Sequence, residues 1–210
     1  MPSQLAQDLA HVDRGMVVAP AGCGKTHLIS EAVGCSQGRQ LVLTHTHAGV
    51  KAIREKMIRL GVPPQLYRVA TIDAFALKYA SAFPSLSGWT IREPEGDQWK
   101  SLRPAAVIVC RAPPVIDVLR ASYVGVYVDE YQDCTIGQHA LVMELASLLP
   151  CRILGDPLQA IFRKINKADA LAWQIAQDSF PEVGALDQPH RWLGRNDNLG
   201  HWLLDVRNSL

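Results

Sequence analysis

The sequence has no Cys-x-x-Cys pair, no long apolar run and almost no excess of charge of either sign. Its five cysteines are odd in number and scattered, which argues against a disulfide framework and against a zinc site. The formal net charge of +1 excludes a strongly basic chain, so any contact with nucleic acid must rest on local residues. The first residues lack the basic and apolar segments of a signal peptide, and no stretch is apolar enough to span a bilayer. We therefore expect a cytoplasmic protein without a membrane partner.

Apolar residues are plentiful, at 48% of the 210 residues, which is enough for one closed core. Short runs rich in valine and isoleucine are each followed by a polar turn and a helical pattern, an alternation typical of a parallel α/β sheet. We expect a single domain over 1–210, with helices on both faces of the sheet. The predicted strands cover 15–19, 40–44, 67–72, 124–128, 151–154 and 184–186, and the predicted helices 26–33, 49–60, 74–82, 136–149, 168–177 and 196–206.

The segment 84–120 breaks this alternation with five prolines, two tryptophans and an ambiguous apolar run at 105–110. Prolines interrupt regular structure, so we expect a short insertion on the sheet that is partly irregular.

Residues 19–26 read Ala-Pro-Ala-Gly-Cys-Gly-Lys-Thr, between a predicted strand and a predicted helix. Glycines let backbone N–H groups surround phosphate oxygens, the lysine neutralises the outer phosphates, and the threonine hydroxyl binds Mg²⁺. Alanine stands where the usual first glycine would be, and the alternative is a glycine-rich turn with an unrelated lysine. The flanking strand and helix favour a P-loop nucleoside triphosphatase. Its expected phosphate contacts are Ala21, Gly22, Cys23, Gly24, Lys25, Thr26 and His27.

The strand at 124–128 ends in two adjacent carboxylates, Asp129 and Glu130. Ligands of a parallel sheet bind at this end of the strands, so Asp129 can join Thr26 in holding Mg²⁺ while Glu130 deprotonates an attacking water. The alternative is an acidic pair that favours the start of the next helix. A P-loop about a hundred residues upstream favours the role in metal binding and catalysis.

A third strand, at 151–154, runs into the turn Gly-Asp-Pro and then Gln159. A glutamine at this place can reach the γ-phosphate and report its presence to a neighbouring loop. A Gly-Asp-Pro turn needs no such role to exist, so both interpretations stay open on this motif alone.

The order of these motifs resembles the first RecA-like domain of superfamily 1 DNA helicases of the UvrD/Rep type. Residues 129–133 read Asp-Glu-Tyr-Gln-Asp, which is similar to the family's Asp-Glu-Phe-Gln-Asp signature. Residues 155–162 resemble its motif III, and 186–191, Leu-Asp-Gln-Pro-His-Arg, resemble its Leu-x-x-Asn-Tyr-Arg motif. The resemblance implies that ATP and Mg²⁺ are the cofactors, that Arg191 contacts the γ-phosphate, and that Gln4 reads the adenine. It implies catalytic roles for Glu130, Gln159 and Arg191.

The same resemblance implies contacts with a single nucleic-acid strand, DNA in this family. The matching positions are His45, Thr46, Phe75, Phe162 and Lys164, and they depart from the family pattern more than the ATP-facing positions do. Lys164 replaces a tryptophan that the family stacks on a base, a contact worth roughly 1–3 kcal/mol. Asp73 places a carboxylate near a phosphate-contacting position. A basic helix with Lys51, Arg54, Lys56 and Arg59 either compensates or is a solvated face.

Helicases of this type hydrolyse ATP between two RecA-like domains, and this chain matches only the first. The leading hypothesis is an ATP-hydrolysing helicase or translocase domain that needs a second RecA-like domain, in cis or from a partner protein, and that turns over slowly alone. The alternative is a nucleotide-gated binding module that regulates a protein or nucleic-acid partner without helicase activity. A small-molecule kinase fits neither the 129–133 motif nor Gln159.

Overall fold

The computed structural model describes residues 1–160 and 171–209 of the chain. In this part the strands form one six-stranded, all-parallel sheet of order β3-β2-β4-β5-β1-β6. The strands are β1 Arg14–Val18, β2 Gln40–Thr44, β3 Tyr67–Thr71, β4 Gly125–Val128, β5 Cys151–Gly155 and β6 Glu182–Ala185. All six predicted strands are present, each within two residues of its expected ends. The predicted α/β fold class is confirmed.

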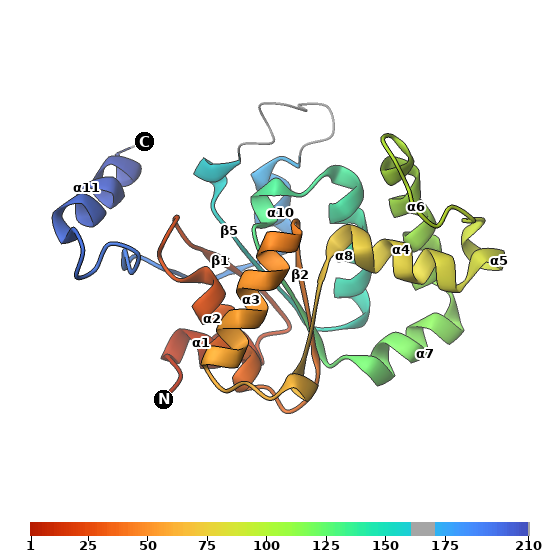
Figure 1. Ribbon diagram of the computed structural model, residues 1–210, viewed down its shortest axis with the longest axis horizontal. Coiled ribbons are helices and arrows are strands. Elements are labelled where there is room, and N and C mark those ends of the chain that lie inside the picture. Colours follow the sequence, from red (N-terminus) through yellow and green to blue (C-terminus); the bar gives the residue numbers. More distant parts are fainter. Residues whose placement is uncertain (161–170, 210) are drawn as a thin grey trace.

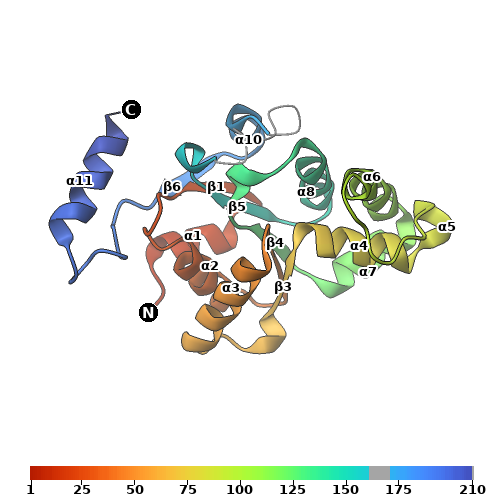
Figure 2. The ribbon, with the colours of Figure 1, turned by 45° about the horizontal axis from the view of Figure 1, so that its top comes forward.

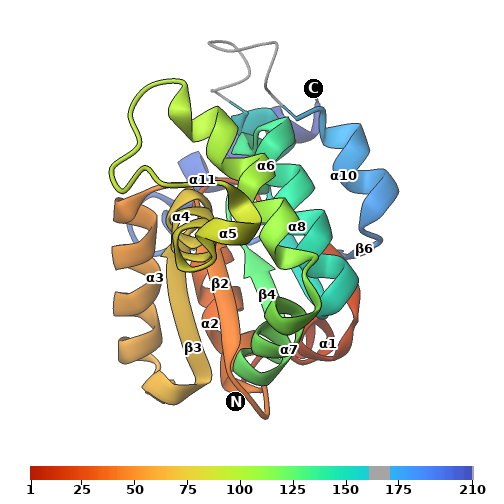
Figure 3. The ribbon, with the colours of Figure 1, turned by 90° about the vertical axis from the view of Figure 1, so that its right-hand side faces the viewer.

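Helices pack on both faces of this sheet (Figures 1 and 3). They are α1 Gln4–His11, α2 Lys25–Gly34, α3 His47–Arg59, α4 Ile72–Ala82, α5 Pro84–Ser87, α6 Gln98–Cys110, α7 Pro113–Ser122, α8 Ile136–Leu148, α10 Trp173–Ser179 and α11 Asp197–Asn208. Short 3₁₀ turns occur at η1 Pro64–Leu66, η2 Tyr131–Asp133 and η3 Pro157–Gln159. No helix among the described residues is both long and apolar enough to cross a membrane.

The core divides into two clusters because successive strand residues point to opposite faces. Met16 and Val128 pack in the cluster beneath α4, α6 and α8, whereas Val17 and Tyr127 pack in the cluster beneath α1, α2 and α3. Both faces of the central strands are therefore buried. This explains why these strands are continuous apolar runs rather than alternating ones.

The segment 84–120 is mostly helical, so the prediction of a partly irregular insertion holds only for the stretch between α5 and α6. Pro84 and Pro113 each stand in the first turn of a helix. A missing N–H costs nothing there, because the first N–H groups of a helix have no internal partner. The apolar run at 105–110 belongs to α6, whose buried side includes Ala105, Ala106, Val109 and Cys110 and packs between α4 and α8. Pro114 also stands at the start of α7, whereas Pro104 lies inside α6 and Pro94 lies between α5 and α6. Prolines that were expected to mark irregular structure thus mostly mark helix starts.

Two further elements differ from expectation. The helix α1 was not predicted; Ser3 caps it by accepting a hydrogen bond from the backbone N–H of Ala6. The helix predicted at 168–177 begins at Trp173 and ends at Ser179, and its predicted first residues lie outside the described part of the chain. The last helix, α11, lies to one side of the sheet at the end of an extended connection (Figures 1 and 2).

Candidate functional site

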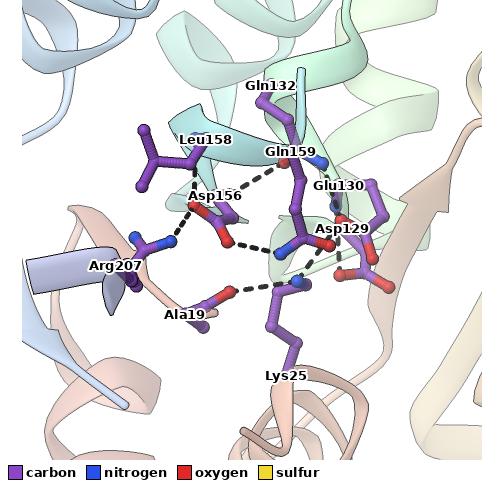
Figure 4. A network of polar contacts seen from close by, with 9 residues as sticks. All are labelled: Ala19, Lys25, Asp129, Glu130, Gln132, Asp156, Leu158, Gln159 and Arg207. Carbon is purple, nitrogen blue, oxygen red and sulfur yellow. Dashed lines mark hydrogen bonds and ion pairs between the residues drawn. The ribbon is translucent and has the colours of Figure 1, made fainter. Parts of the chain in front are cut away.

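Three loops meet at the carboxyl edge of the sheet. The loop of residues 19–24 leaves β1, the pair Asp129–Glu130 leaves β4, and the turn beginning at Asp156 leaves β5. Since β5 lies between β1 and β4, its turn is flanked by the other two loops. The topology alone therefore brings together the three motifs that the sequence analysis singled out (Figure 4).

The loop after β1 has the backbone of a phosphate cradle. Gly22 and Gly24 take positive φ values of 80° and 97°, a region that L side chains rarely adopt. Gly24 is also the N-cap of α2 and supplies no side-chain cap. The first N–H groups of this ten-residue helix are thus not capped by a side chain, and they carry the positive end of the helix dipole. Such a helix start is suited to an anion.

Lys25 lies in the first turn of α2 and is only 7% exposed. Its Nζ donates to the carbonyl oxygen of Ala19 at 3.0 Å and lies 3.4 Å from Oε2 of Glu130. A buried ammonium needs such partners. The carbonyl of Ala19 fixes the lysine across its own loop, so its charge is directed at the cradle.

Asp129 is 4% exposed, at the end of β4. Burial, and next the nearby charge of Glu130, raise the pKa of its carboxyl group to about 7, while Lys25 acts in the opposite direction. Such a carboxylate is stabilised by a cation. No group of three or more His, Cys, Asp or Glu in the described residues could hold a metal. One carboxylate and the Thr26 hydroxyl nevertheless fit Mg²⁺, which uses few protein ligands together with phosphates and water.

Glu130 has φ 55° and ψ 42°, the left-handed region, and is the one non-glycine residue with positive φ in the described chain. Its N–H donates to Oδ1 of Asp129 at 3.0 Å, and its Oε2 accepts from Nε2 of Gln132 at 2.8 Å. A conformation of this kind costs of order 1–3 kcal/mol and persists only where the surroundings impose it. These contacts hold the Glu130 carboxylate beside Lys25, although the side chain stays partly exposed.

Gln132 joins this pair to the turn after β5. Its Oε1 accepts from the backbone N–H of Asp156 at 2.9 Å. The Asp156 carboxylate in turn accepts from Nε2 of Gln159 and from Nη1 of Arg207 (Figure 4). Gln159 therefore lies next to Lys25 and Glu130 at the end of a continuous chain of hydrogen bonds.

A cavity of about 860 Å³ opens over the glycine loop, and many of the side chains that line it are basic. The backbone N–H of Arg191 donates to the carbonyl of Gly22 at 3.0 Å, so the segment with His190 and Arg191 lies directly against the loop. A Cβ at Gly22 would come within 2.8 Å of the Arg191 Cβ, so this glycine is also required by close packing. The charged and histidine side chains that line the cavity are Lys25, His27, Lys56, Arg59, Glu130, His190, Arg191 and Arg195.

Most of the predicted phosphate and catalytic residues therefore converge. Ala21, Gly22, Gly24, Lys25, Thr26, His27, Glu130, Gln159 and Arg191 all line this cavity. Cys23 is buried in the core beneath the loop instead. Gln4 is exposed at the start of α1, donates to Asp8, and is not among the residues that line the cavity.

Three of the residues predicted to contact nucleic acid, His45, Thr46 and Phe75, lie in the described part of the chain, and these three do not form one exposed surface. Phe75 is only 3% exposed and packs against Tyr79 with ring centroids 4.5 Å apart, so in this structure it belongs to the core. His45 lies with its Nε2 3.6 Å from Sγ of Cys134, and burial lowers its pKa to about 4. Thr46 is exposed, but its hydroxyl caps α3. Phe162 and Lys164 lie outside the described residues.

Asp73 does not approach this cavity either. It accepts from Nε and Nη2 of Arg103 at 2.9 and 3.0 Å, and from Nε2 of Gln138 at 3.2 Å. Arg103 belongs to α6, so the carboxylate that looked unfavourable for phosphate contact is neutralised by the inserted helices.

The sequence did not predict roles for Gln132, Arg195 and Arg207. It also did not predict that Lys56 and Arg59 line the cavity. Gln132 carried no signal beyond its place in the 129–133 motif. Lys56 and Arg59 are three residues apart on α3, a spacing that puts them on one face of the helix. That spacing could have grouped them, but only the packing of α3 beside α2 directs them to the cavity.

No family model and no curated protein matches this chain. Among solved structures it is similar to the arterivirus nonstructural protein 10, a helicase, in complex with DNA, with a TM-score of 0.46 and 14% identity. A structure of the arterivirus nonstructural protein 10 helicase described without DNA gives a TM-score of 0.45 and 14% identity. In both cases the match covers 87% of this chain and 37% of the other. The chain thus spans little more than a third of the helicase that it matches.

Proposed function

We propose that this chain binds ATP together with Mg²⁺ and hydrolyses it when a second RecA-like domain, in cis or from a partner, completes the site. One observation carries the proposal. Lys25, Glu130 and Gln159, which follow three different strands, meet around a cavity whose walls add three arginines and a second lysine. That combination suits a triphosphate and offers little to an uncharged ligand.

Each residue has a role that follows from its position. Lys25 and the N–H groups that start α2 would hold the phosphates, and Asp129 with Thr26 would hold Mg²⁺, which neutralises charge on the phosphates. Glu130 would orient a water and accept its proton, since its carboxylate is held at the cavity by Gln132 and Lys25. Arg191 would neutralise charge at the far phosphate.

We further propose that the chain is the first motor domain of a UvrD-like superfamily 1 helicase or translocase that acts on single-stranded nucleic acid, which is DNA in the family that it resembles. The sequence from 129 to 133 and the motif at 186–191 support this. Because Phe75 is buried, the remaining contacts would be mainly cations on phosphates. Binding should then be weak and strongly dependent on salt, which a labelled oligonucleotide titrated at two salt concentrations would test.

The test of the nucleotide site is a calorimetric titration of Mg–ATP into the wild type, Lys25→Ala and Lys51→Ala. Loss of a charged hydrogen-bond partner is worth about 1.5–3 kcal/mol, so Lys25→Ala should weaken binding about 10- to 100-fold. Lys51 is an exposed lysine of α3 that does not line the cavity, and its replacement should change little. Equal affinities for all three proteins would rule out the site.

A nucleotide-gated binding module is the alternative, and the departures at the nucleic-acid positions favour it. The two functions differ in turnover. An arginine supplied from outside is worth about 10³–10⁵ in rate in related phosphate chemistry, so the chain alone should hydrolyse ATP slowly under both hypotheses. A longer chain or partner that closes the cavity should raise turnover sharply for a motor. Persistently slow turnover in that complex would favour the module.

A further inference from the structure

Asp156 is the centre of a buried network at the end of β5. It is 1% exposed, and its carboxylate accepts from the backbone N–H of Leu158 at 3.1 Å, from Nε2 of Gln159, and from Nη1 of Arg207 at 2.5 Å. A buried carboxylate with a cationic partner is stable only as a pair, because removal of the cation leaves an uncompensated charge. Arg207 is therefore required by Asp156, although the two are 51 positions apart.

Arg207 comes from α11, which otherwise lies to one side of the sheet (Figures 1 and 2). Between α11 and the glycine loop is a second cavity of about 300 Å³. Leu203, Leu204 and Val206 of α11 face Pro20 and Leu158 across it. The ion pair with Asp156 is thus a tether between this helix and the phosphate site.

The tether reaches the phosphate site through Gln159, which lines both cavities. A glutamine amide has two N–H donors. One of them is occupied by Asp156, which fixes the plane of the amide and leaves the second donor for another acceptor. In Figure 4 this side chain lies between Asp156 and the pair Lys25–Glu130. Loss of the hydrogen bond to Asp156 would let the Gln159 amide rotate away from the pair Lys25–Glu130.

We infer that Arg207 is a positioning residue for the phosphate site, and that α11 responds when nucleotide binds. Arg207 holds Asp156, Asp156 orients Gln159, and a phosphate oxygen that accepts from the second N–H of Gln159 stabilises the whole arrangement. Binding at the glycine loop and docking of α11 are then linked equilibria, each of which strengthens the other. This inference rests on the proposed nucleotide site.

Hydrogen exchange of residues 197–208 with and without Mg–ATP tests the link. In the wild type, Mg–ATP should slow exchange in α11, whereas in Gln159→Ala nucleotide should still bind without this effect. Arg207→Met keeps the apolar stem and removes the charge, and should speed exchange in α11 about tenfold before nucleotide is added. Arg111→Met removes an arginine paired with Glu144 away from the site and should leave exchange in α11 unchanged.

Steady-state hydrolysis over a range of Mg–ATP concentrations gives a second measurement. Arg207→Met should lower kcat about tenfold and change KM less than about twofold, and Arg207→Lys should restore part of the loss. If the wild type binds Mg–ATP but α11 does not respond, the inference is wrong and the proposed function stands. If Arg207→Met behaves like Arg111→Met in both measurements, the inference is also wrong. If the wild type binds no Mg–ATP, the proposed function and the inference fail together.

Discussion

The carboxyl edge of the sheet and the predicted nucleic-acid positions of this chain differ in how far the sequence determines them. At the carboxyl edge, the backbone conformation of the glycine loop, of the end of β4 and of the turn after β5 is set by nearby residues, and the strand order then brings the three together. The nucleic-acid positions carry residue types that could contact a strand, but Phe75 lies in the core and Thr46 caps a helix. Backbone geometry is encoded locally, whereas the exposure of a side chain is decided by everything that packs around it.

The largest expected effect concerns Glu130 and tests the proposed role of a residue at the carboxyl edge of the sheet. Glu130→Gln keeps the shape of the side chain and removes its basicity, so single-turnover hydrolysis should fall about 10²–10⁴-fold. Mg–ATP affinity should change only a few-fold. Glu144→Gln, a paired glutamate of α8, is the matched control and should retain full activity. If hydrolysis by Glu130→Gln were within about twofold of the wild type, Glu130 would not be the base.

The next effect concerns Phe75 and tests whether this residue belongs to the core or contacts nucleic acid. As a core residue, Phe75→Ala should lower the free energy of unfolding by about 3–5 kcal/mol, measured in urea. Leu86→Ala, at an exposed position of α5, should cost less than about 1 kcal/mol. Oligonucleotide affinity of the folded Phe75→Ala protein should remain within about twofold of the wild type. If Phe75→Ala were fully stable but no longer bound the oligonucleotide, Phe75 would be a nucleic-acid contact and not a core residue.

A pH effect is expected at Asp129. Its pKa rises from the ordinary value of 3.8 to about 7 in the folded chain, chiefly through burial. The folded state then holds this proton more tightly, so its contribution to stability is complete below about pH 4 and is lost as pH rises through about 7. Asp129→Asn cannot ionise, so its stability relative to the wild type should increase between pH 4 and pH 7 when chelator removes divalent cations.

Urea unfolding at several pH values in this range measures that difference. Asp117→Asn, at an exposed position of α7, serves as the control for loss of one charge. A constant difference between wild type and Asp129→Asn across the range would contradict the assignment of a buried, proton-binding carboxylate at the end of β4.

The smallest effect concerns Thr46. Its hydroxyl accepts from the backbone N–H of Gly49 at 3.0 Å, so Thr46→Ala should lower stability by about 1 kcal/mol, and Thr46→Ser should restore it. Thermal unfolding measures this. A loss of oligonucleotide binding by Thr46→Ala that exceeds its loss of stability would show that the residue also faces the nucleic acid.

The sheet was predictable because each buried strand is a short apolar run between turns, and all six were found. The glycine loop of residues 19–24 and the Asp129–Glu130 pair were predictable as motifs, and their roles stay proposals. Other features were not predictable. The prolines at 84 and 113 are compatible with either a loop or a helix start, and only the packing of α5 and α7 against α6 decides between them. No sequence pattern predicts the ion pair between Arg207 and Asp156, because the two residues are 51 positions apart and meet only in the folded chain.

The register of β5 has a consequence for how this fold could be altered or recombined. Ile153 is paired with Met16 of β1 on one side and with Val128 of β4 on the other. A single inserted or deleted residue in β5 would reverse which side chains face each layer, and it would displace two loops at once. Strand β5 can be exchanged only together with both of its neighbours.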